Sequence, residues 1–186
     1  MIISHDREKL INAILYFAKN TNYCGKIKIL KLLSELDFTH FKQTGRSVTG
    51  LDYSSWEMGP VPAALFNELS GQMRPDLAEA IQIKPIDAFQ KIVPVKKFNS
   101  TYFTKREKKL LADFVEIFKN ATAEQMMEST HRTGGPWDKT VKEKGLNQPI
   151  DYFAALNNDS DSLSLDDATE RVRERQEMYE TFGVKE

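Results

Sequence analysis

Residues 26–62, with the sequence KIKILKLLSELDFTHFKQTGRSVTGLDYSSWEMGPVP, decide the fold. At 100° per residue, the first part forms an amphipathic helix that closes at Gly45. Its apolar stripe is centred on Leu33, and we expect water on the opposite side. That opposite side carries Lys28, Lys31, Glu35 and Lys42. A glycine-punctuated, extended segment follows the helix, and Gly59-Pro60 then makes a turn.

Two polar residues, Asp37 and His40, fall inside the apolar stripe. Residues three apart are neighbours on a helix surface, so their side chains can meet. A carboxylate and an imidazole that face a core must be paired, or their burial costs several kcal/mol. We therefore predict a buried Asp37–His40 hydrogen bond that fixes the helix against the Gly59-Pro60 turn.

Composition indicates a single globular domain with a possible appendage. The chain has 186 residues, and 26 lysines and arginines stand against 27 aspartates and glutamates. The resulting net charge of -1 argues against a protein that coats nucleic acid, although a local basic patch is compatible with it. One cysteine, no secretory signal and no long apolar run predict a cytoplasmic protein without a membrane span.

Helical patterns dominate the remainder of the chain, and two segments have strand character. Helices are predicted over about 4–19, 63–70, 76–81, 104–118, 122–131, 138–144 and 149–156. A short strand is predicted around Tyr53, and two or three more between residues 83 and 103. The expected fold is mainly α with a small antiparallel β-sheet (α+β), a compact helical domain with a C-terminal helix.

The C-terminal part divides from this domain by composition. Residues 157–164 (NNDSDSLS) have the character of a linker, and residues 165–182 form a densely charged helix capped by Ser164. We therefore predict a domain over 1–156, a linker over 157–164 and a charged C-terminal segment over 165–186. We favour a solvated terminal helix over a partner-binding arm.

Catalytic and metal-binding chemistry has only weak support. Asp37 and His40 could ligate a metal with His131, but no HExxH or CxxC motif accompanies them. A structural role explains the first two residues equally well, and we favour it. Cys24 lacks the local signature of a nucleophile and is better interpreted as a small buried hydrophobe. We predict no cofactor and no metal.

Aromatic and basic side chains could serve either the core or a binding surface. Trp56 and Trp137 lie beside Gly-Pro turns and could be core anchors or the anchors of an interface. The basic runs at residues 26–31 and 105–109 are interpreted as solvated helix faces, which makes a nucleic-acid contact unlikely.

A series of short motifs runs through residues 8–150. They comprise Leu30, Leu32, Leu33, Asp37, Phe38 and His40, then Gly45-Arg46, Val48-Thr49-Gly50, Tyr53 and Gly59-Pro60-Val61, and finally Thr130-His131 and Pro136-Trp137. In order and spacing they resemble the Panacea antitoxin domain, a SocA-like domain often labelled a phage-associated protein. The chain departs from that pattern at Ser34-Glu35 and in the added acidic linker and terminal helix.

This resemblance implies an antitoxin of a toxin–antitoxin system, of a kind found in phages and prophages. It would neutralise a cognate toxin, encoded by an adjacent gene, through direct contact, as a possible homodimer or as a heterotetramer with the toxin. No catalytic residues come with the family. The positions that carry over only as its signature, structural or toxin-binding, are Asp37, His40, Gly45, Gly50, Tyr53, Gly59, Pro60, His131 and Trp137.

Three further functions are compatible with the same residues. The chain could be an adaptor that delivers a bound protein to a protease. It could be a metal-dependent enzyme that uses Asp37, His40 and His131. The chain could in addition be a DNA-binding autorepressor, a function for which the sequence offers less support.

Overall fold

A computed structural model describes residues 1–86 and 89–185, and helices dominate it. The helices are α1 (Asp6–Asn20), α2 (Lys26–Thr44), α3 (Ala63–Ser70), α4 (Pro75–Ala80), α5 (Lys105–Phe118), α6 (Ala123–Thr130), α7 (Pro136–Lys144) and α8 (Leu165–Phe182), with 3₁₀ turns η1 (Ser100–Tyr102) and η2 (Tyr152–Ala155). The strands are β1 (Ile2–Ile3), β2 (Tyr53–Trp56), β3 (Gly59–Val61), β4 (Ile81–Ile86), β5 (Phe89–Pro94), β6 (Pro149–Ile150) and β7 (Val184–Lys185). The predicted class, mainly α with small antiparallel sheets, is confirmed.

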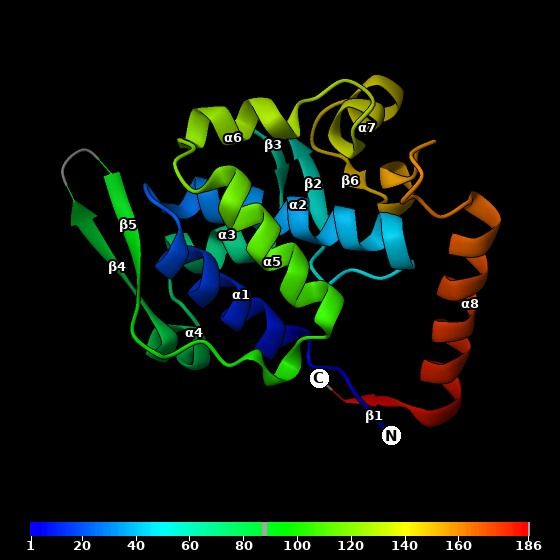
Figure 1. Ribbon diagram of the computed structural model, residues 1–186, viewed down its shortest axis with the longest axis horizontal. Coiled ribbons are helices and arrows are strands. Elements are labelled where there is room, and N and C mark those ends of the chain that lie inside the picture. Colours follow the sequence, from blue (N-terminus) through cyan, green and yellow to red (C-terminus); the bar gives the residue numbers. More distant parts are fainter. Residues whose placement is uncertain (87–88, 186) are drawn as a thin grey trace.

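Helix α2 crosses the middle of the molecule and is surrounded on all sides (Figure 1). It contacts α1, α3, α5, α6, α8, β3, β5 and η2. Its apolar residues Ile29, Leu30, Leu32, Leu33 and Leu36 are fully buried in one continuous core. Burial of this many large aliphatic side chains makes α2 the largest single contribution to the hydrophobic stabilisation.

The prediction that α2 has a water-facing side is wrong. Lys28, Lys31 and Glu35 are 1%, 0% and 5% exposed, and Lys42 is half-buried. The helical wheel assumes one wet face, but α5, α6 and β3 cover that face of α2. The buried charges are satisfied by fixed partners, as burial demands.

The two lysines bind backbone carbonyls, and the glutamate binds an arginine. The Lys28 ammonium donates to the carbonyls of Asn22 (2.7 Å) and Ala121 (2.6 Å), the latter just beyond the end of α5. Lys31 donates to the Pro60 carbonyl in β3 at 2.9 Å. Glu35 accepts from Arg132 at 3.1 Å. Each contact connects α2 to a different neighbouring segment.

Two small antiparallel sheets lie beside the helices. In the first, β2 pairs with both β3 and β6, with Ser55 opposite Pro60 and Tyr53 opposite Ile150. This confirms the strand predicted around Tyr53. In the second, β4 and β5 form a hairpin with Ile83 opposite Ile92.

The strands β4 and β5 agree with the prediction of two or three strands between residues 83 and 103, and the Asn99 side chain accepts from Thr101 N to cap the 3₁₀ turn η1 before Phe103. One predicted element differs from that observed. The helix predicted over 149–156 is instead β6 followed by η2, because Ile150 pairs with β2.

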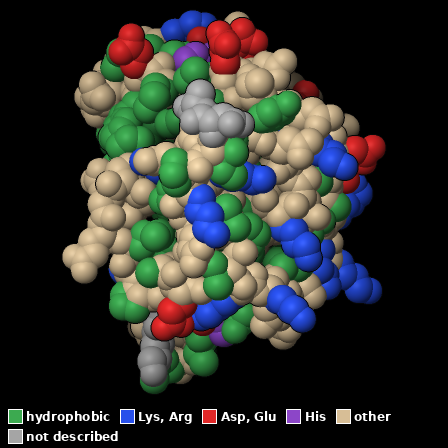
Figure 2. Space-filling model, turned by 90° about the vertical axis from the view of Figure 1, so that its left-hand side faces the viewer, with side chains coloured by type: hydrophobic (Ala, Val, Ile, Leu, Met, Phe, Trp, Pro, Cys, Tyr) green, Lys and Arg blue, Asp and Glu red, His purple; other side chains and the backbone are tan. Residues whose placement is uncertain are grey.

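The face that carries the β4–β5 hairpin has hydrophobic side chains interspersed with lysines and arginines (Figure 2). Beside the hairpin lies a hollow of about 450 Å³, lined by Tyr23, Ile27, Phe89 and Ala123 among others. Within the described residues, no helix combines the length and the apolar character needed to traverse a bilayer.

Helix α8 stands at the edge of the molecule and is tied to it at both ends (Figure 1). At its start, Leu163 N donates to the Lys42 carbonyl, and Ala168 is the one fully buried residue of the helix as described. At its end, β7 pairs with β1, with Val184 opposite Ile2. Most other side chains of α8 are exposed or half-buried, as expected for a solvated helix.

Gly45 allows α8 to pack closely against the C-terminal end of α2. It ends α2 in the left-handed conformation (φ 73°), and a Cβ there would lie 3.1 Å from the Arg171 Cβ. Glycine adopts this conformation without the steric cost that other residues incur. The predicted end of the helix at Gly45 is therefore confirmed, and the residue has a second role as the seat of α8.

Gly45→Ala should lower the free energy of unfolding more than Gly134→Ala. Both glycines have nearly equal φ (73° and 77°), but a Cβ at Gly134 meets nothing within 4 Å. The control should lose only the backbone cost of about 1–2 kcal/mol, and Gly45→Ala should lose about 1–3 kcal/mol more from overpacking. Chemical denaturation of both variants measures this, and equal losses would show that α8 does not rest on Gly45.

Candidate functional site

The Asp37 carboxylate is fully buried at the centre of a hydrogen-bonded network. Its Oδ1 accepts from the backbone N–H groups of Val48 (2.8 Å) and Thr49 (2.9 Å). Its Oδ2 accepts from the Tyr53 hydroxyl (2.8 Å) and from the Thr49 hydroxyl. Four donors thus hold the segment after α2 and the start of β2 against the helix.

Burial and these donors act on the pKa of Asp37 in opposite directions. Removal from water raises the pKa to about 6, and the four hydrogen bonds limit that rise because they favour the charged form. The same burial, together with the charge of Asp37, raises the pKa of Tyr53 well above 10. Tyr53 therefore acts as a donor to the carboxylate at every physiological pH.

Aromatic rings seal the network from solvent. The Tyr53 ring packs on Phe38 at 5.1 Å between centroids, and Phe38 packs on Tyr152 at 5.0 Å. The Tyr152 hydroxyl donates to the Leu51 carbonyl at 2.6 Å. The loop after α2 is thereby held by a carboxylate on one side and by aromatic packing on the other.

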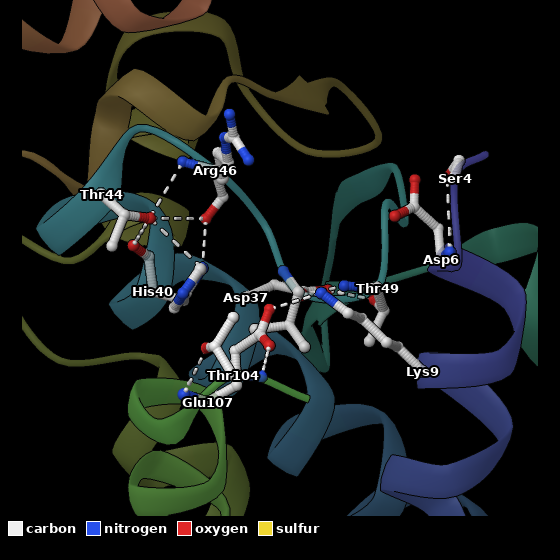
Figure 3. A network of polar contacts seen from close by, with 11 residues as sticks. Ser4, Asp6, Lys9, Asp37, His40, Thr44, Arg46, Thr49, Thr104 and Glu107 are labelled. Carbon is white, nitrogen blue, oxygen red and sulfur yellow. Dashed lines mark hydrogen bonds and ion pairs between the residues drawn. The ribbon is translucent and has the colours of Figure 1, made fainter. Parts of the chain in front are cut away.

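The predicted Asp37–His40 hydrogen bond is wrong, although both residues are buried. Figure 3 shows Asp37 directed towards Thr49, whereas His40 is directed towards Thr44 and Arg46. His40 Nδ1 lies 2.8 Å from the Arg46 carbonyl. The returning loop offers the carboxylate backbone donors, and the chain just beyond the helix offers the imidazole a free carbonyl. Burial lowers the pKa of His40.

A second cluster of polar groups surrounds the Gly59-Pro60 turn. A Cβ on Gly59, whose φ is 99°, would lie 2.9 Å from Lys31 Nζ, 2.9 Å from Thr130 Oγ1 and 3.0 Å from His131 Nε2. Only glycine satisfies both this φ and this crowding. The turn therefore brings the backbone of β3 into contact with α2 and with the end of α6.

Trp137 covers this cluster. Its ring stacks on His131, with centroids 4.0 Å apart and an interplanar angle of 11°, and its Nε1 donates to the Trp56 carbonyl at 2.8 Å. Trp56 packs in turn on Phe66. Both tryptophans, left open as core or interface anchors, are half-buried and take part in packing within the fold.

Lys31 and His131 are basic groups held close together. Burial lowers the pKa of Lys31 to about 7. Burial and the nearby Lys31 ammonium lower the pKa of His131. His131 Nε2 is buried and has no hydrogen-bond partner among the described residues. Both side chains are therefore driven towards their neutral forms near neutral pH.

The remaining residues singled out from the sequence lie apart from these clusters. Gly50 follows Thr49 with φ 68° and lies against the Asp6 side chain, and Gly45 lies under α8. Cys24 is fully buried, and burial raises the pKa of its thiol, which supports the interpretation as a small hydrophobe.

The three residues of the metal hypothesis are not brought together. Asp37 faces the loop, His40 faces the Arg46 carbonyl and His131 faces Gly59. Within the described residues, no group of three or more His, Cys, Asp or Glu side chains has the arrangement needed to hold a metal ion.

Roles for Thr49, Thr130 and Lys31 in these two clusters were not predicted from the sequence. Thr49 had a usable signal, because a Ser/Thr/Gly-rich segment eleven to twelve residues after a buried carboxylate supplies donors that return along the helix. Lys31 had none, because its partner is a backbone carbonyl 29 residues away.

The residues of both clusters lie within a segment that matches a known protein family. The family model described as antitoxin SocA-like, Panacea domain, matches residues 29–138, more than half of the chain. This range contains both the Asp37 network and the Gly59 cluster. Neither the curated proteins nor the solved structures include a significant match.

Asp37→Asn should destabilise the fold by about 3 kcal/mol, because the amide replaces an acceptor oxygen by a donor that faces other donors. The matched control is Asp113→Asn, in which an exposed carboxylate loses an ion pair with Lys109 that is worth at most about 0.5 kcal/mol. Urea denaturation of both variants measures the difference. Equal stabilities of the two variants would refute the proposed network.

The stability of the folded chain should rise with pH through the titration of Lys31. The pKa is near 10.4 in the unfolded chain and about 7 in the folded one. Between these values the unfolded state binds more protons, so this contribution grows by about 1.4 kcal/mol per pH unit as the pH rises above 7. Below pH 7 both states are protonated and the contribution is absent.

Lys31→Met isolates this effect, because it keeps a long side chain and removes the titration. The stability of the wild type relative to Lys31→Met should increase from pH 7 to pH 9, as measured by denaturant unfolding in matched buffers. Parallel pH profiles for the two proteins would contradict the assignment of a neutral, buried Lys31.

Proposed function

Since the chain belongs to the antitoxin SocA-like, Panacea domain family, we propose that it neutralises a cognate protein toxin by binding it directly. The observation that carries this proposal is the family match over residues 29–138. In this proposal the toxin is encoded by an adjacent gene and is blocked by occlusion in the cytoplasm.

The disposition of the signature residues supports a binding function rather than catalysis. The Asp37 carboxylate accepts four hydrogen bonds from its own chain. The Trp137 N–H is bound to the Trp56 carbonyl, and His131 is covered by the Trp137 ring. These groups are committed to holding the fold, and a toxin would then meet the surface side chains that this frame positions.

The proposed role of the signature is therefore structural. Asp37 and Tyr53 hold the segment after α2, and Gly59, Pro60, His131 and Trp137 hold the β2–β3 turn to α6 and α7. A frame of this kind presents a pre-organised surface, and pre-organisation reduces the entropy lost on binding.

Co-expression with the product of the adjacent gene tests the proposal. The adjacent gene should arrest growth when expressed alone, and the wild-type chain should restore growth. Asp113→Asn should restore growth equally, whereas Asp37→Asn should restore less, in proportion to its loss of folded protein. A gene product that is harmless alone, or equally harmful in the presence of this chain, would refute the antitoxin function.

Direct binding is separable from delivery to a protease. A mixture of this chain and the toxin, both purified, should elute as one complex. Light scattering would give the stoichiometry of that complex and distinguish a heterodimer from a heterotetramer. The lifetime of the toxin in cells should not change when this chain is present. An adaptor would shorten the lifetime of the toxin. In a protease-deficient strain it would still bind the toxin but would not restore growth. These two results together would favour an adaptor instead.

A further inference from the structure

A groove runs between α8 and the body of the protein. One hollow of about 430 Å³ and another of about 280 Å³ share five lining residues, His40, Arg46, Thr104, Arg175 and Met178, so the two are continuous. We call this space the α8 groove. Its volume is in the range of small-molecule sites.

Arginines that form no ion pair within residues 1–86 and 89–185 line the α8 groove. Arg46 comes from the loop after α2, Arg106 from the first turn of α5, and Arg171 and Arg175 from successive turns of α8. None of these four forms an ion pair with a carboxylate of the described residues. Their hydrogen bonds go to neutral groups, such as the Thr44 carbonyl, the Gln43 amide and the Tyr179 hydroxyl.

Every other arginine of the chain is paired. Arg7 and Arg74 bind Glu68, Arg132 binds Glu35, and Arg173 lies near Glu177. The four arginines without a carboxylate partner in the described part of the chain are thus the four that line one hollow. A shortage of nearby acids does not explain why these four arginines lack carboxylate partners, because α8 itself carries six acids that could pair with them.

The local charge is strongly positive as a result. Among the described residues that line the larger hollow, Glu174 is the one carboxylate beside the four arginines. In the smaller hollow, Glu107 is neutralised by Lys9 at 2.6 Å, and Asp6 is the other acid. Arginine forks match carboxylate and phosphate oxygens in bidentate geometry, so a compact anion would satisfy the groove.

The attachment of α8 at both ends decides the size of the occupant. Ala168 rests on Gly45 at one end, and β7 pairs with β1 at the other. A folded partner could not enter between α8 and the body unless one of these attachments broke, whereas a small molecule could. Met178 provides an apolar wall beside the arginines.

We propose that the α8 groove binds a small ligand that carries a pyrophosphate group, either free or as part of a nucleotide. A pyrophosphate group carries about three negative charges in a small volume, whereas a single carboxylate carries only one. The site is separate from the proposed toxin-binding function, and it can be tested without a toxin.

Isothermal titration calorimetry at low ionic strength provides the test, with sodium pyrophosphate, inorganic phosphate, ADP and AMP as probes. Pyrophosphate and ADP should bind at least about tenfold more tightly than phosphate and AMP. Equal affinities for pyrophosphate and ADP would assign the site to the pyrophosphate group alone, and tighter binding of ADP would assign it to a nucleotide.

Variants on two different elements test the location. Arg175→Gln on α8 and Arg106→Gln on α5 should each weaken pyrophosphate binding by about tenfold. Arg173→Gln is the matched control, because it removes the same charge from the same helix but from an arginine that lies near Glu177 outside the groove. It should bind within about twofold of wild type.

Three results would overturn the proposal. The first is the absence of saturable binding of any probe up to about 5 mM. The second is an equal loss of affinity in Arg173→Gln, which would indicate diffuse electrostatic attraction. The third is tighter binding of a hexaglutamate peptide than of pyrophosphate, which would make the groove a site for an acidic peptide.

Discussion

The fold depends on one buried carboxylate. Asp37 projects from the central helix into the interior, where it loses water and must be satisfied by its own chain. It is satisfied by two backbone amides and one hydroxyl from the segment between α2 and β2, and by the hydroxyl of Tyr53, the first residue of β2. That segment has no regular hydrogen-bonding partner until β2 begins, so the carboxylate replaces a strand as the partner of its backbone.

The position of β2 and β3 follows from this constraint. Once residues 48–53 are held along α2, β2 starts at Tyr53 and β3 returns over the helix, where the Pro60 carbonyl meets Lys31. The close approach at Gly59 then admits Thr130 and His131, and Trp137 closes the cluster. Removal of the Asp37 carboxylate would therefore disturb the packing of Trp137 through this series of contacts. Asp37, Tyr53, Gly59, His131 and Trp137 therefore belong to one connected set of contacts.

Local signals in the sequence predicted much of the fold. Thr104 with Glu107 and Thr122 with Gln125 form capping boxes at the starts of α5 and α6, and Ser164 caps α8 as expected. These features depend on residues within one turn of each other, so the sequence displays them directly. Helix boundaries and the strand at Tyr53 could therefore be predicted.

The interior of the candidate site could not be predicted in the same way. Two of the four donors to Asp37, and the partner of Lys31, are backbone groups, which every residue carries and which no residue pattern marks. The water-facing side expected on α2 is absent because α5, α6 and β3 cover it. A helical wheel contains no information on what packs against a helix. The same limit concealed the groove, since its arginines come from separate segments of the chain.

Amide hydrogen exchange at Val48 and Thr49 tests the central role of Asp37 most directly. Both amides lie outside regular secondary structure, yet each donates to the buried carboxylate. Protection as strong as that of amides in the middle of α2 is the result this account predicts, because release then requires the core to open. Exchange as fast as that of the exposed neighbour Gly50 would contradict it.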